Sequence, residues 1–582
     1  MENVNIKING IDVSAPAGAT ILEAAHYAGI KIPTLCFLKE INEIGACRIC
    51  IVEVKGARNL VASCVHPINE GMEVFTNTIE VLESRRRTLQ LILSNHDRKC
   101  LSCVRSGDCE LQQLCKQLGV ADESYFDGKM TQYEIDDSAE HMIRDNNKCI
   151  LCRRCSAVCE VTQSVGVIGP NNRGFDTFIG SPFDMGLAKT SCISCGQCIA
   201  VCPTGALTEK DFTDDILKAI ADPSKHVVVQ TAPSVRAGLG EEFGYPIGTD
   251  VEGKMAAALR RIGFDKVFDT DFSADVTIME EATEFLDRVN NGGVLPLITS
   301  CSPGWIKFCE YYFPDMTENL SSCKSPQQMF GALTKTYYAD KFGIDPKDIV
   351  CVSVMPCTAK KFEIGRDDQS AVGNGIPDVD IAITTRELAR LIKKMDIDFT
   401  SLPEETFDNP LGESTGAAVI FGATGGVMEA ALRTAVEVLT GEELASLDFT
   451  DVRGTKGIKE ATYNVAGMDV KVAIASGTAN ARELLNKVKS GEADYHFIEI
   501  MGCPGGCVNG GGQPQVPADV RNFTDVRALR AKVLYDNDAN KTIRKSHENP
   551  SVKKVYEEYL EKPGSHKAHR ILHTSYVKRT IN

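Results

Sequence analysis

The sequence has no run of about eighteen consecutive apolar residues, roughly the length that a helix needs to cross a membrane. We therefore expect no membrane insertion. The first residues, MENVNIKINGIDVS, carry charges early and contain no apolar core of the length found in signal peptides. Together these two absences predict a cytoplasmic protein.

Basic residues are scarce relative to acidic ones: 63 Lys and Arg stand against 79 Asp and Glu, for a net charge of -16. Nucleic acids are bound by clustered Lys and Arg, so this balance argues against a nucleic-acid partner. A nucleotide fingerprint is also missing, because the glycines of FGATGGVMEAAL match neither GxGxxG nor the Walker pattern. A flavin or nicotinamide cofactor would therefore belong to another protein.

Cysteine is the residue that the chain has in excess. Sixteen of its 23 cysteines lie between Cys36 and Cys202, and the other seven are scattered over the rest. In a cytoplasmic chain, cysteines in CxxC spacing more often bind metal or do catalysis than form disulfides. The distribution predicts a metal-rich N-terminal arm attached to a larger globular domain.

The most specific pattern is a repeat, CILCRRCSAVC and CISCGQCIAVCP, in which each run reads C-x2-C-x2-C-x3-C. This spacing is typical of two-cluster ferredoxins, where the fourth cysteine of each run binds the other cluster. Two zinc sites are the alternative. We assign one [4Fe-4S] cluster to Cys149, Cys152, Cys155 and Cys202, and a second to Cys192, Cys195, Cys198 and Cys159.

Two further groups of ligands precede this repeat. The first resembles a plant-type [2Fe-2S] site, although ten residues rather than four separate its first two cysteines; a structural zinc is the alternative. The second offers three cysteines and a nearby histidine, which would complete a [4Fe-4S] cluster, with Cys115 as a second candidate for the fourth ligand. The two sets are Cys36, Cys47, Cys50 and Cys64, and then His96, Cys100, Cys103 and Cys109.

Hydrophobic patterning predicts a multidomain protein with α+β and α/β units. A hairpin signal at Asn9-Gly10 opens a β-rich unit, and a helical pattern follows it. Strand-like and helix-like runs then alternate from residue 224, which favours an α/β domain. The expected units are 1–78, 79–125, 142–210, 224–545 and a helical tail over 546–582.

Three cysteine-bearing loops follow strand-like runs of the α/β domain: TSCSPGW, MPCTAKKFE and MGCPGGCVNGGGQP. Together they supply four thiols, the number that a cubane needs, from Cys301, Cys357, Cys503 and Cys507. The glycines of the last loop allow a close approach of backbone to a ligand. A tight turn with two structural cysteines is the alternative for that loop.

These three loops, in this order and beside the accessory segments, resemble the signature segments of [FeFe]-hydrogenases over nearly the whole chain. The resemblance implies a β-grasp ferredoxin-like unit, a small helical Fe-S unit, a two-cluster bacterial ferredoxin-like unit and a large H-cluster domain. It also implies a tail similar to a hydrogenase small-subunit segment. The expected reaction is reversible H2 oxidation and proton reduction at an H-cluster, a [4Fe-4S] cubane joined to a two-iron subsite with CO, cyanide and a dithiolate amine.

The same resemblance assigns roles around that cofactor. Cys357, Cys503 and Cys507 would bind the cubane, with Cys507 bridging to the two-iron subsite. The ammonium of Lys360 would donate to a cyanide. The remaining contacts of the two-iron subsite would come from Met355, Met501, Ala232, Pro233 and Ser234, although core filling is an equally ordinary role for the two methionines.

A proton relay is also implied. Glu281 and Glu284 lie three residues apart on one helical face in TIMEEATEFLDR, a spacing that by itself is most often a solvated charge pair. The resemblance makes them proton carriers, with Ser321 between them and Arg288 at the outer end.

The first loop departs from the family pattern. Many members have Cys-Cys-Pro where this chain has Cys301-Ser302-Pro303. By register, Cys301 would pass protons and Ser302 would stand at the ligand position. By chemistry, iron prefers thiolate, and we expect Cys301 to be the fourth cubane ligand with Ser302 available for proton transfer; Cys323 is a weaker candidate.

Electrons must come from a separate protein. We expect ferredoxin, a flavin-containing NAD(P)-binding subunit, or both, and we favour a multi-subunit electron-bifurcating complex over a stand-alone ferredoxin-dependent enzyme. Dedicated maturation proteins would supply the two-iron subsite. A hydrogen sensor, an iron-sulfur assembly factor and a subunit of an NADH dehydrogenase are the alternatives of other classes.

Overall fold

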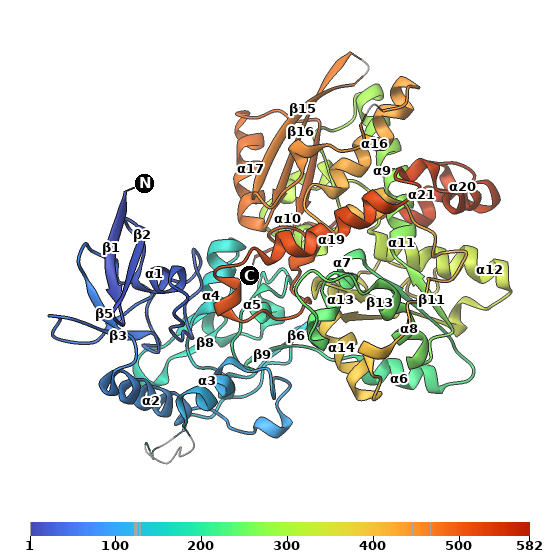
Figure 1. The fold of residues 1–582 in the computed structure, drawn as a ribbon. Helices are drawn as coiled ribbons and strands as arrows, with labels where there is room; N and C mark the ends of the chain where they lie inside the picture. The colour runs from blue at the N-terminus through green and yellow to red at the C-terminus, as the bar shows by residue number, and fades with distance from the viewer. Residues whose placement is uncertain are drawn as a thin grey trace.

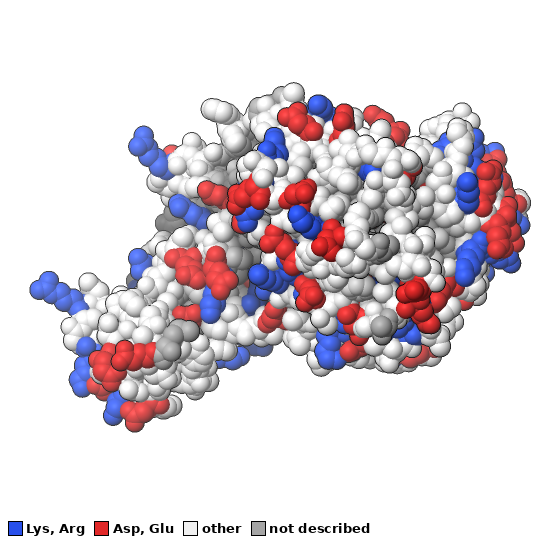
Figure 2. All heavy atoms as spheres, turned by 90° about the horizontal axis from the view of Figure 1, so that it is seen from above, with Lys and Arg blue, Asp and Glu red and all other residues white. Residues whose placement is uncertain are grey.

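The computed structural model describes residues 2–120, 126, 128, 130–444, 446–465 and 467–581. The expected boundary at residue 125 lies outside these residues. Figure 1 shows the N-terminal units on one side of the molecule and the α/β domain on the other. On the face shown in Figure 2, acidic and basic side chains are interspersed, without a continuous basic field.

The first unit is a five-stranded mixed sheet in the order β2-β1-β5-β3-β4, with α1 packed on it. Asn9 and Gly10 both have positive φ, at 54° and 82°, and they close the β1-β2 hairpin as predicted. The elements are β1 (Asn3–Ile8), β2 (Ile11–Pro16), α1 (Ile21–Tyr27), β3 (Ile51–Val54), β4 (Val61–Ala62) and β5 (Glu73–Phe75).

The next two units are small and rich in loops. Helices α2 (Ile79–Leu93) and α3 (Glu110–Leu118) share one apolar cluster with Leu35 and Ile49 of the first unit. The third unit is held by two short antiparallel ribbons and two short helices. These are β6 (Met142–Arg144) with β9 (Leu207–Glu209), β7 (Gly169–Asn171) with β8 (Phe178–Gly180), α4 (Arg154–Ala157) and α5 (Gln197–Ala200).

The α/β domain contains two four-stranded sheets. The first is wholly parallel, in the order β11-β10-β13-β14, and the second has the order β12-β17-β16-β15 with only β15 antiparallel. The strands are β10 (His226–Thr231), β11 (Lys266–Asp269), β12 (Leu297–Ile298), β13 (Ile349–Met355), β14 (Ile381–Thr384), β15 (Ile458–Val465), β16 (Met468–Ser476) and β17 (Phe497–Met501).

Helices cover both faces of each sheet, as strands buried on two sides require. Helix α9 lies between the two sheets: Phe272 and Val276 pack with the first sheet, and Ala274 and Ile278 pack with the second. The helices are α6 (Thr213–Ala221), α7 (Pro233–Arg236), α8 (Glu252–Ile262), α9 (Asp271–Asn291), α10 (Pro303–Tyr312), α11 (Pro326–Leu333), α12 (Ala339–Phe342), α13 (Ala359–Glu363), α14 (Thr385–Lys394), α15 (Gly416–Val419), α16 (Gly426–Thr440), α17 (Thr478–Ser490), α18 (Ala518–Arg521) and α19 (Val526–Asn540).

The last residues form α20 (Pro550–Val555) and α21 (His566–Leu572), which pack on the first sheet's apolar cluster. Glu280 of α9 anchors this tail through the Tyr556 hydroxyl (2.6 Å), the Gly564 amide (3.0 Å) and the His573 ring (3.1 Å). The expected fold class is confirmed, while the expected unit boundaries stay predictions. Within the described residues, no helix combines the length and the apolar character needed to span a bilayer.

Candidate active site

A cavity of about 80 Å³ lies where loops after β10, β12, β13 and β17 meet. Each loop leaves the carboxyl end of a parallel strand, which is the usual position of sites in α/β sheets. Most residues expected at the cofactor line this cavity: Ala232, Pro233, Cys301, Ser302, Met355, Cys357, Lys360, Met501, Cys503 and Cys507. Ser234 is the exception, because its hydroxyl lies behind the wall and donates to the Gly422 carbonyl (3.3 Å).

Sequence reasoning missed three polar or aromatic residues of the lining, Thr270, Gln327 and Phe421. The Thr270 hydroxyl donates to Gln230, and the Gln327 amide donates to Glu363 and accepts from Ser353. Gln327 follows Ser325-Pro326, a helix-start signal that fixes where its side chain points. That signal was available in KSPQQ, but nothing local relates it to a cavity.

Glycines of the glycine-rich loop are required where this loop packs closely against other loops. A Cβ on Gly510 would lie 2.0 Å from the Pro356 carbonyl oxygen, and one on Gly511 would lie 2.1 Å from the Cys195 carbonyl oxygen. Glycine is therefore needed for the Cys503 loop to reach both the Cys357 loop and the two-cluster unit. We expected the glycines to make room for a cofactor, and here they also join its binding loops.

The thiols of the cavity suit a metal-bound state. Burial raises the pKa of Cys507 to about 12, and it also raises the pKa of Cys301, Cys357 and Cys503. In such surroundings an unliganded thiol keeps its proton, and a metal ion must displace that proton to obtain a thiolate. Three predicted cubane ligands facing one small cavity, with a fourth donor from Cys301 or Ser302, fit an iron-sulfur cofactor.

Lys360 lies at the cavity wall with all three of its hydrogens engaged. Its ammonium donates to the Cys301 carbonyl (3.2 Å), the Ser325 hydroxyl (2.8 Å) and the Glu363 carboxylate (2.9 Å). An ammonium has three donors. A hydrogen bond from Lys360 to a bound ligand therefore replaces one of these contacts.

Cys301 and Ser302 point to different surroundings. The nearest charged groups to the Cys301 thiol include Glu281, which adds to burial in raising the pKa of Cys301. Cys301 and Cys507 both pack against the apolar cluster that includes Met501. The Ser302 hydroxyl instead accepts from the Gly502 amide (3.1 Å), directly before Cys503.

A line of hydrogen-bonding groups leads from Cys301 along α9 toward the surface. Glu281 is buried, and burial together with the nearby Glu284 charge raises its pKa to about 8, although a hydrogen bond with Ser321 opposes that shift. The Ser321 hydroxyl donates to Glu284 (2.8 Å), and Arg288 pairs with Glu284 (2.6 Å). The structure thus places the four predicted relay residues in sequence.

The predicted [2Fe-2S] ligands converge in the first unit. The Cys50 and Cys64 sulfurs are 3.3 Å apart, and the Cys47 amide lies 3.5 Å from the Cys36 sulfur. The contact with Cys47 lowers the pKa of Cys36 to about 6, and the contact with Cys64 lowers the pKa of Cys50 to about 7. Sulfurs this close fit ligands of a single small cluster.

His96 is buried, and its Nδ1 makes no hydrogen bond to any described residue. Burial lowers the pKa of His96, which favours the neutral imidazole that binds metal. A Cβ on Gly205 would lie 2.6 Å from the Cys103 sulfur, and the Cys109 sulfur lies 3.6 Å from the Pro203 carbonyl. This predicted site therefore lies against the two-cluster unit, while Cys115 packs among the leucines of α2 and α3.

The two-cluster unit brings its cysteines together in the crossed pattern expected. Cys202 lies near the first run and adds to the burial that raises the pKa of Cys149 and Cys152. A second small cavity is lined by Cys159, Cys192, Cys195 and Cys198. Cys195 in turn lies near Cys503 of the active-site loop, since the charge of Cys503 adds to the burial that raises the pKa of Cys195. The thiol groups thus form a series that ends at the main cavity.

A series of buried thiol sites that leads to a cavity beside a line of hydrogen-bonded carboxylates is typical of an iron-sulfur oxidoreductase. Residues 225–511 match the family described as iron only hydrogenase large subunit, C-terminal domain, and residues 524–579 match the iron hydrogenase small subunit. The accessory units match a 2Fe-2S binding domain (1–78), the iron-sulfur binding region of NADH-ubiquinone oxidoreductase G (85–124) and a 4Fe-4S dicluster domain (130–206).

Relatives match over the whole length. The chain is 53% identical to the NADP-reducing hydrogenase subunit HndD of Solidesulfovibrio fructosivorans, covering 100% of both chains. It is 44% identical to iron hydrogenase 1 of Clostridium pasteurianum, covering 98% of this chain and 100% of the relative. A solved structure of apo [FeFe]-hydrogenase HydA1 from Chlamydomonas reinhardtii is 43% identical with a TM-score of 0.57, covering 63% of this chain and 99% of that one. The chain belongs to the [FeFe]-hydrogenase family, whose members are oxidoreductases acting on H2.

Proposed function

We propose that this hydrogenase interconverts H2 with protons and electrons as one subunit of a multi-subunit NAD(P)- and ferredoxin-linked electron-bifurcating complex. The observation that carries the catalytic part is the position of Glu281 of α9 close enough to the thiol cavity for its charge to raise the pKa of Cys301. The full-length similarity to a subunit described as NADP-reducing supports the complex. Its cytoplasmic location remains a prediction.

The proposed cofactors are one [2Fe-2S] cluster, three accessory [4Fe-4S] clusters and the H-cluster. When bound, the H-cluster supplies the iron site at which H2 is split or formed. Cys357, Cys503 and Cys507 would hold its cubane, and Cys507 would also serve the two-iron subsite. Met355, Met501, Ala232 and Pro233 line the same cavity and would exclude water from that subsite, which dedicated maturation proteins would load.

For the first loop, the surroundings of the two side chains support the assignment made by register rather than the one made from the preference of iron for thiolate. We propose that Cys301 carries protons, because Glu281 is the charged group that most affects its thiol. Ser302 would then stand at the position of the fourth cubane ligand, beside Gly502 and Cys503. This reverses our expectation from sequence that Cys301 binds iron.

Protons would pass between Cys301 and the surface through Glu281, Ser321 and Glu284. With its pKa raised to about 8, Glu281 holds a proton near neutral pH and can still release it. Arg288 fixes the Glu284 carboxylate at the outer end. Electrons would travel through the accessory clusters, of which the one bound by Cys195 lies nearest to the active-site loop.

Two other functions are distinguishable. A stand-alone ferredoxin-dependent hydrogenase is supported by the similarity to iron hydrogenase 1. A hydrogen sensor or a non-catalytic iron-sulfur protein would not need the buried Glu281–Ser321–Glu284 series, which is complete here.

The catalytic test is H2 evolution from an artificial reductant by anaerobically matured protein. No turnover with the two-iron subsite fully loaded would exclude the enzyme. Complex membership is tested separately, by purifying the native protein under mild conditions. A co-purifying flavoprotein that reduces NAD(P) with H2 would support the complex, and an isolated chain that exchanges electrons directly with ferredoxin would support the stand-alone enzyme.

A further inference from the structure

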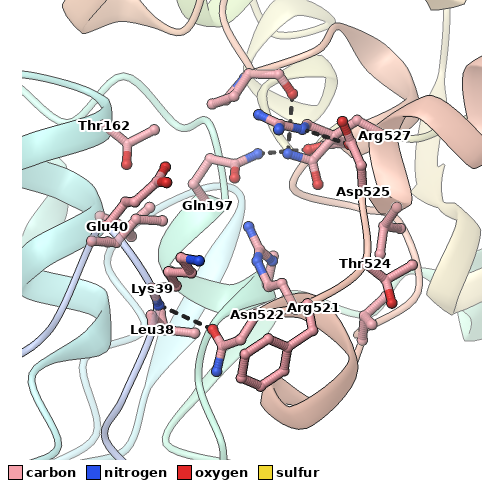
Figure 3. A pocket seen from close by; sticks show the side chains of 18 of the residues that line it. Leu38, Lys39, Glu40, Thr162, Gln197, Arg521, Asn522, Thr524, Asp525 and Arg527 are labelled. Atoms are coloured by element: carbon pink, nitrogen blue, oxygen red, sulfur yellow. Dashed lines mark hydrogen bonds and ion pairs between the residues drawn. The ribbon is translucent and has the colours of Figure 1, made fainter. Parts of the chain in front are cut away.

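A cavity of about 630 Å³ lies apart from the active site. Its walls come from three units: the loop and helix around His26 and Leu38, the two-cluster unit around Thr162 and Gln197, and the segment 504–530 of the α/β domain. Figure 3 shows the side chain of Arg521 extending from the end of α18 into this space, toward Gln197.

Arg521 differs from the other cations around the cavity. Within the part of the chain that the structure describes, Arg521 makes no hydrogen bond and has no carboxylate within ion-pair distance. The neighbouring cations each pair with a carboxylate. Those pairs are Lys39 with Glu23 (3.0 Å), Arg527 with Asp525 (3.1 Å), Arg530 with Glu241 (2.7 Å) and Arg154 with Glu110 (2.8 Å). Burial and the charges of Arg530, Arg154 and Arg527 lower the pKa of Arg521 to about 10, so the guanidinium stays charged at neutral pH.

A second polar group in the same cavity also lacks a partner. Gln197 is 1% exposed, and its Oε1 accepts no hydrogen bond from a described residue, while its Nε2 donates to the Asn509 carbonyl (2.8 Å). Buried acceptors of this kind are normally satisfied. Because Gln197 has almost no accessible surface, its oxygen lies behind the cavity wall, and Arg521 is the group that offers free donors to the cavity.

We propose that this cavity binds a phosphate-type oxyanion through Arg521. The planar guanidinium fork of Arg521 matches two oxygens of a phosphate. Glu23, Glu40 and Asp525 also line the cavity; Lys39 pairs with Glu23 and Arg527 with Asp525, which limits the repulsion of an anion by those two carboxylates. The ligand would be held at the end of α18, in a cavity whose other walls come from the first unit and the two-cluster unit.

The cavity lies beside the loops that carry predicted cluster ligands. Gln197 lies between Cys195 and Cys198 in sequence and is bonded to the glycine-rich loop through Asn509. An oxyanion bound at Arg521 would lie at the junction where these units meet. The proposal is independent of the proposed complex, since it requires only this chain.

The test is calorimetric titration of the full-length, cluster-loaded protein with inorganic phosphate at constant ionic strength. We expect saturable binding that weakens about tenfold or more in Arg521→Gln and less than about threefold in Arg527→Gln, whose native charge is already paired. Hydrogen evolution from an artificial reductant should stay within about twofold in both variants, because neither residue touches the active site.

Further arms keep the result decisive. If Arg521→Gln fails to load its clusters, Arg521→Lys keeps the charge but loses the fork, and it should weaken phosphate binding to a similar extent. Tighter binding of adenosine monophosphate than of phosphate would identify a phosphate ester as the ligand, and equal binding would identify the free ion. Absence of saturable binding, or unchanged affinity in the Arg521 variants, would overturn the proposal.

Discussion

The accessory units and the α/β domain hold their thiols in opposite ways. Most predicted accessory ligands lie close together in sequence, such as Cys149, Cys152 and Cys155. Short loops packed on a small apolar core hold them in position. The active-site thiols come from loops at positions 301, 357 and 503, and only two complete sheets bring them together. The first kind of site is encoded locally, and the second kind is a product of the tertiary fold.

The strongest way to separate the two regions is Cys357→Ala. Removal of a predicted cubane ligand should abolish H2 turnover, while the iron and the electron paramagnetic resonance signals of the accessory clusters remain. Cys351→Ala is the matched control, because Cys351 is a buried packing residue on β13, the strand that precedes the site. Its expected cost is stability alone, about 1–2 kcal/mol. Loss of accessory iron in the Cys357 variant would contradict this separation.

Glu281→Gln should reduce H2 turnover by about 100-fold or more, because the amide cannot pass a proton between Cys301 and Ser321. Both the H-cluster spectrum and the accessory clusters should be unchanged. The adjacent Glu280→Gln is the control: Glu280 anchors the tail rather than the relay, so turnover should stay within a few-fold while the melting temperature falls. Equal turnover losses in the two variants would refute the relay.

Cys301→Ser separates the two roles considered for the first loop. If Cys301 carries protons, the cubane signal and iron content persist and turnover falls by about 10- to 100-fold. If Cys301 binds iron, the variant loses the H-cluster signal, as Cys357→Ala does. The measurement is iron content and spectroscopy of the same sample used for turnover.

The α/β domain should also show a pH dependence that comes from Glu281. The pKa of Glu281 is raised from 4.5 to about 8 by folding, so between these values the native state binds the proton that the unfolded state releases. The associated stability is complete below about pH 4.5 and is lost as pH rises through about 8, on the order of a few kcal/mol in total. As pH rises through this window, the melting temperature of the wild type should therefore fall relative to that of Glu281→Gln. A pH-independent difference would mean that Glu281 is ionised when buried.

The smallest effect is expected at His96. His96→Cys replaces a neutral ligand with an anionic one, so the reduction potential of that single cluster should fall while H2 turnover with an artificial reductant stays within a few-fold. Cys115→Ala is the control and should leave every potential unchanged, because Cys115 packs among leucines of α3. Redox titration followed by electron paramagnetic resonance gives both values. A shift in the Cys115 variant would identify Cys115 as the ligand instead.

Sequence reasoning succeeded where the signal was local. Asn9-Gly10 determined the first hairpin by backbone conformation alone, and the two C-x2-C-x2-C-x3-C runs carried their own crossed pairing. It was incomplete where distance in sequence mattered. Gln327 could not be connected with Met355, and the glycines after Cys507 gave no sign that they pack on Pro356 and Cys195.

The same contrast explains the difficulty with Ser302. Residue spacing indicated which loop would bind the cofactor, but not whether Cys301 or Ser302 faces it. The surroundings of Cys301 depend on α9, which supplies Glu281. Those of Ser302 depend on the Gly502 amide, which lies 200 residues further along the chain. Only the packed domain brings those two neighbours into place.

The pairing of β12 with β17 has a consequence for biosynthesis. It joins Leu297 to Phe497, so the ribosome must release a long stretch of chain before this contact can form, and parallel pairing over such a distance is slow. Accessory clusters can be inserted into short segments soon after these emerge. The active-site pocket exists only once the strand before Cys503 has joined the sheet, so the catalytic cofactor has to be delivered to a chain that has already folded.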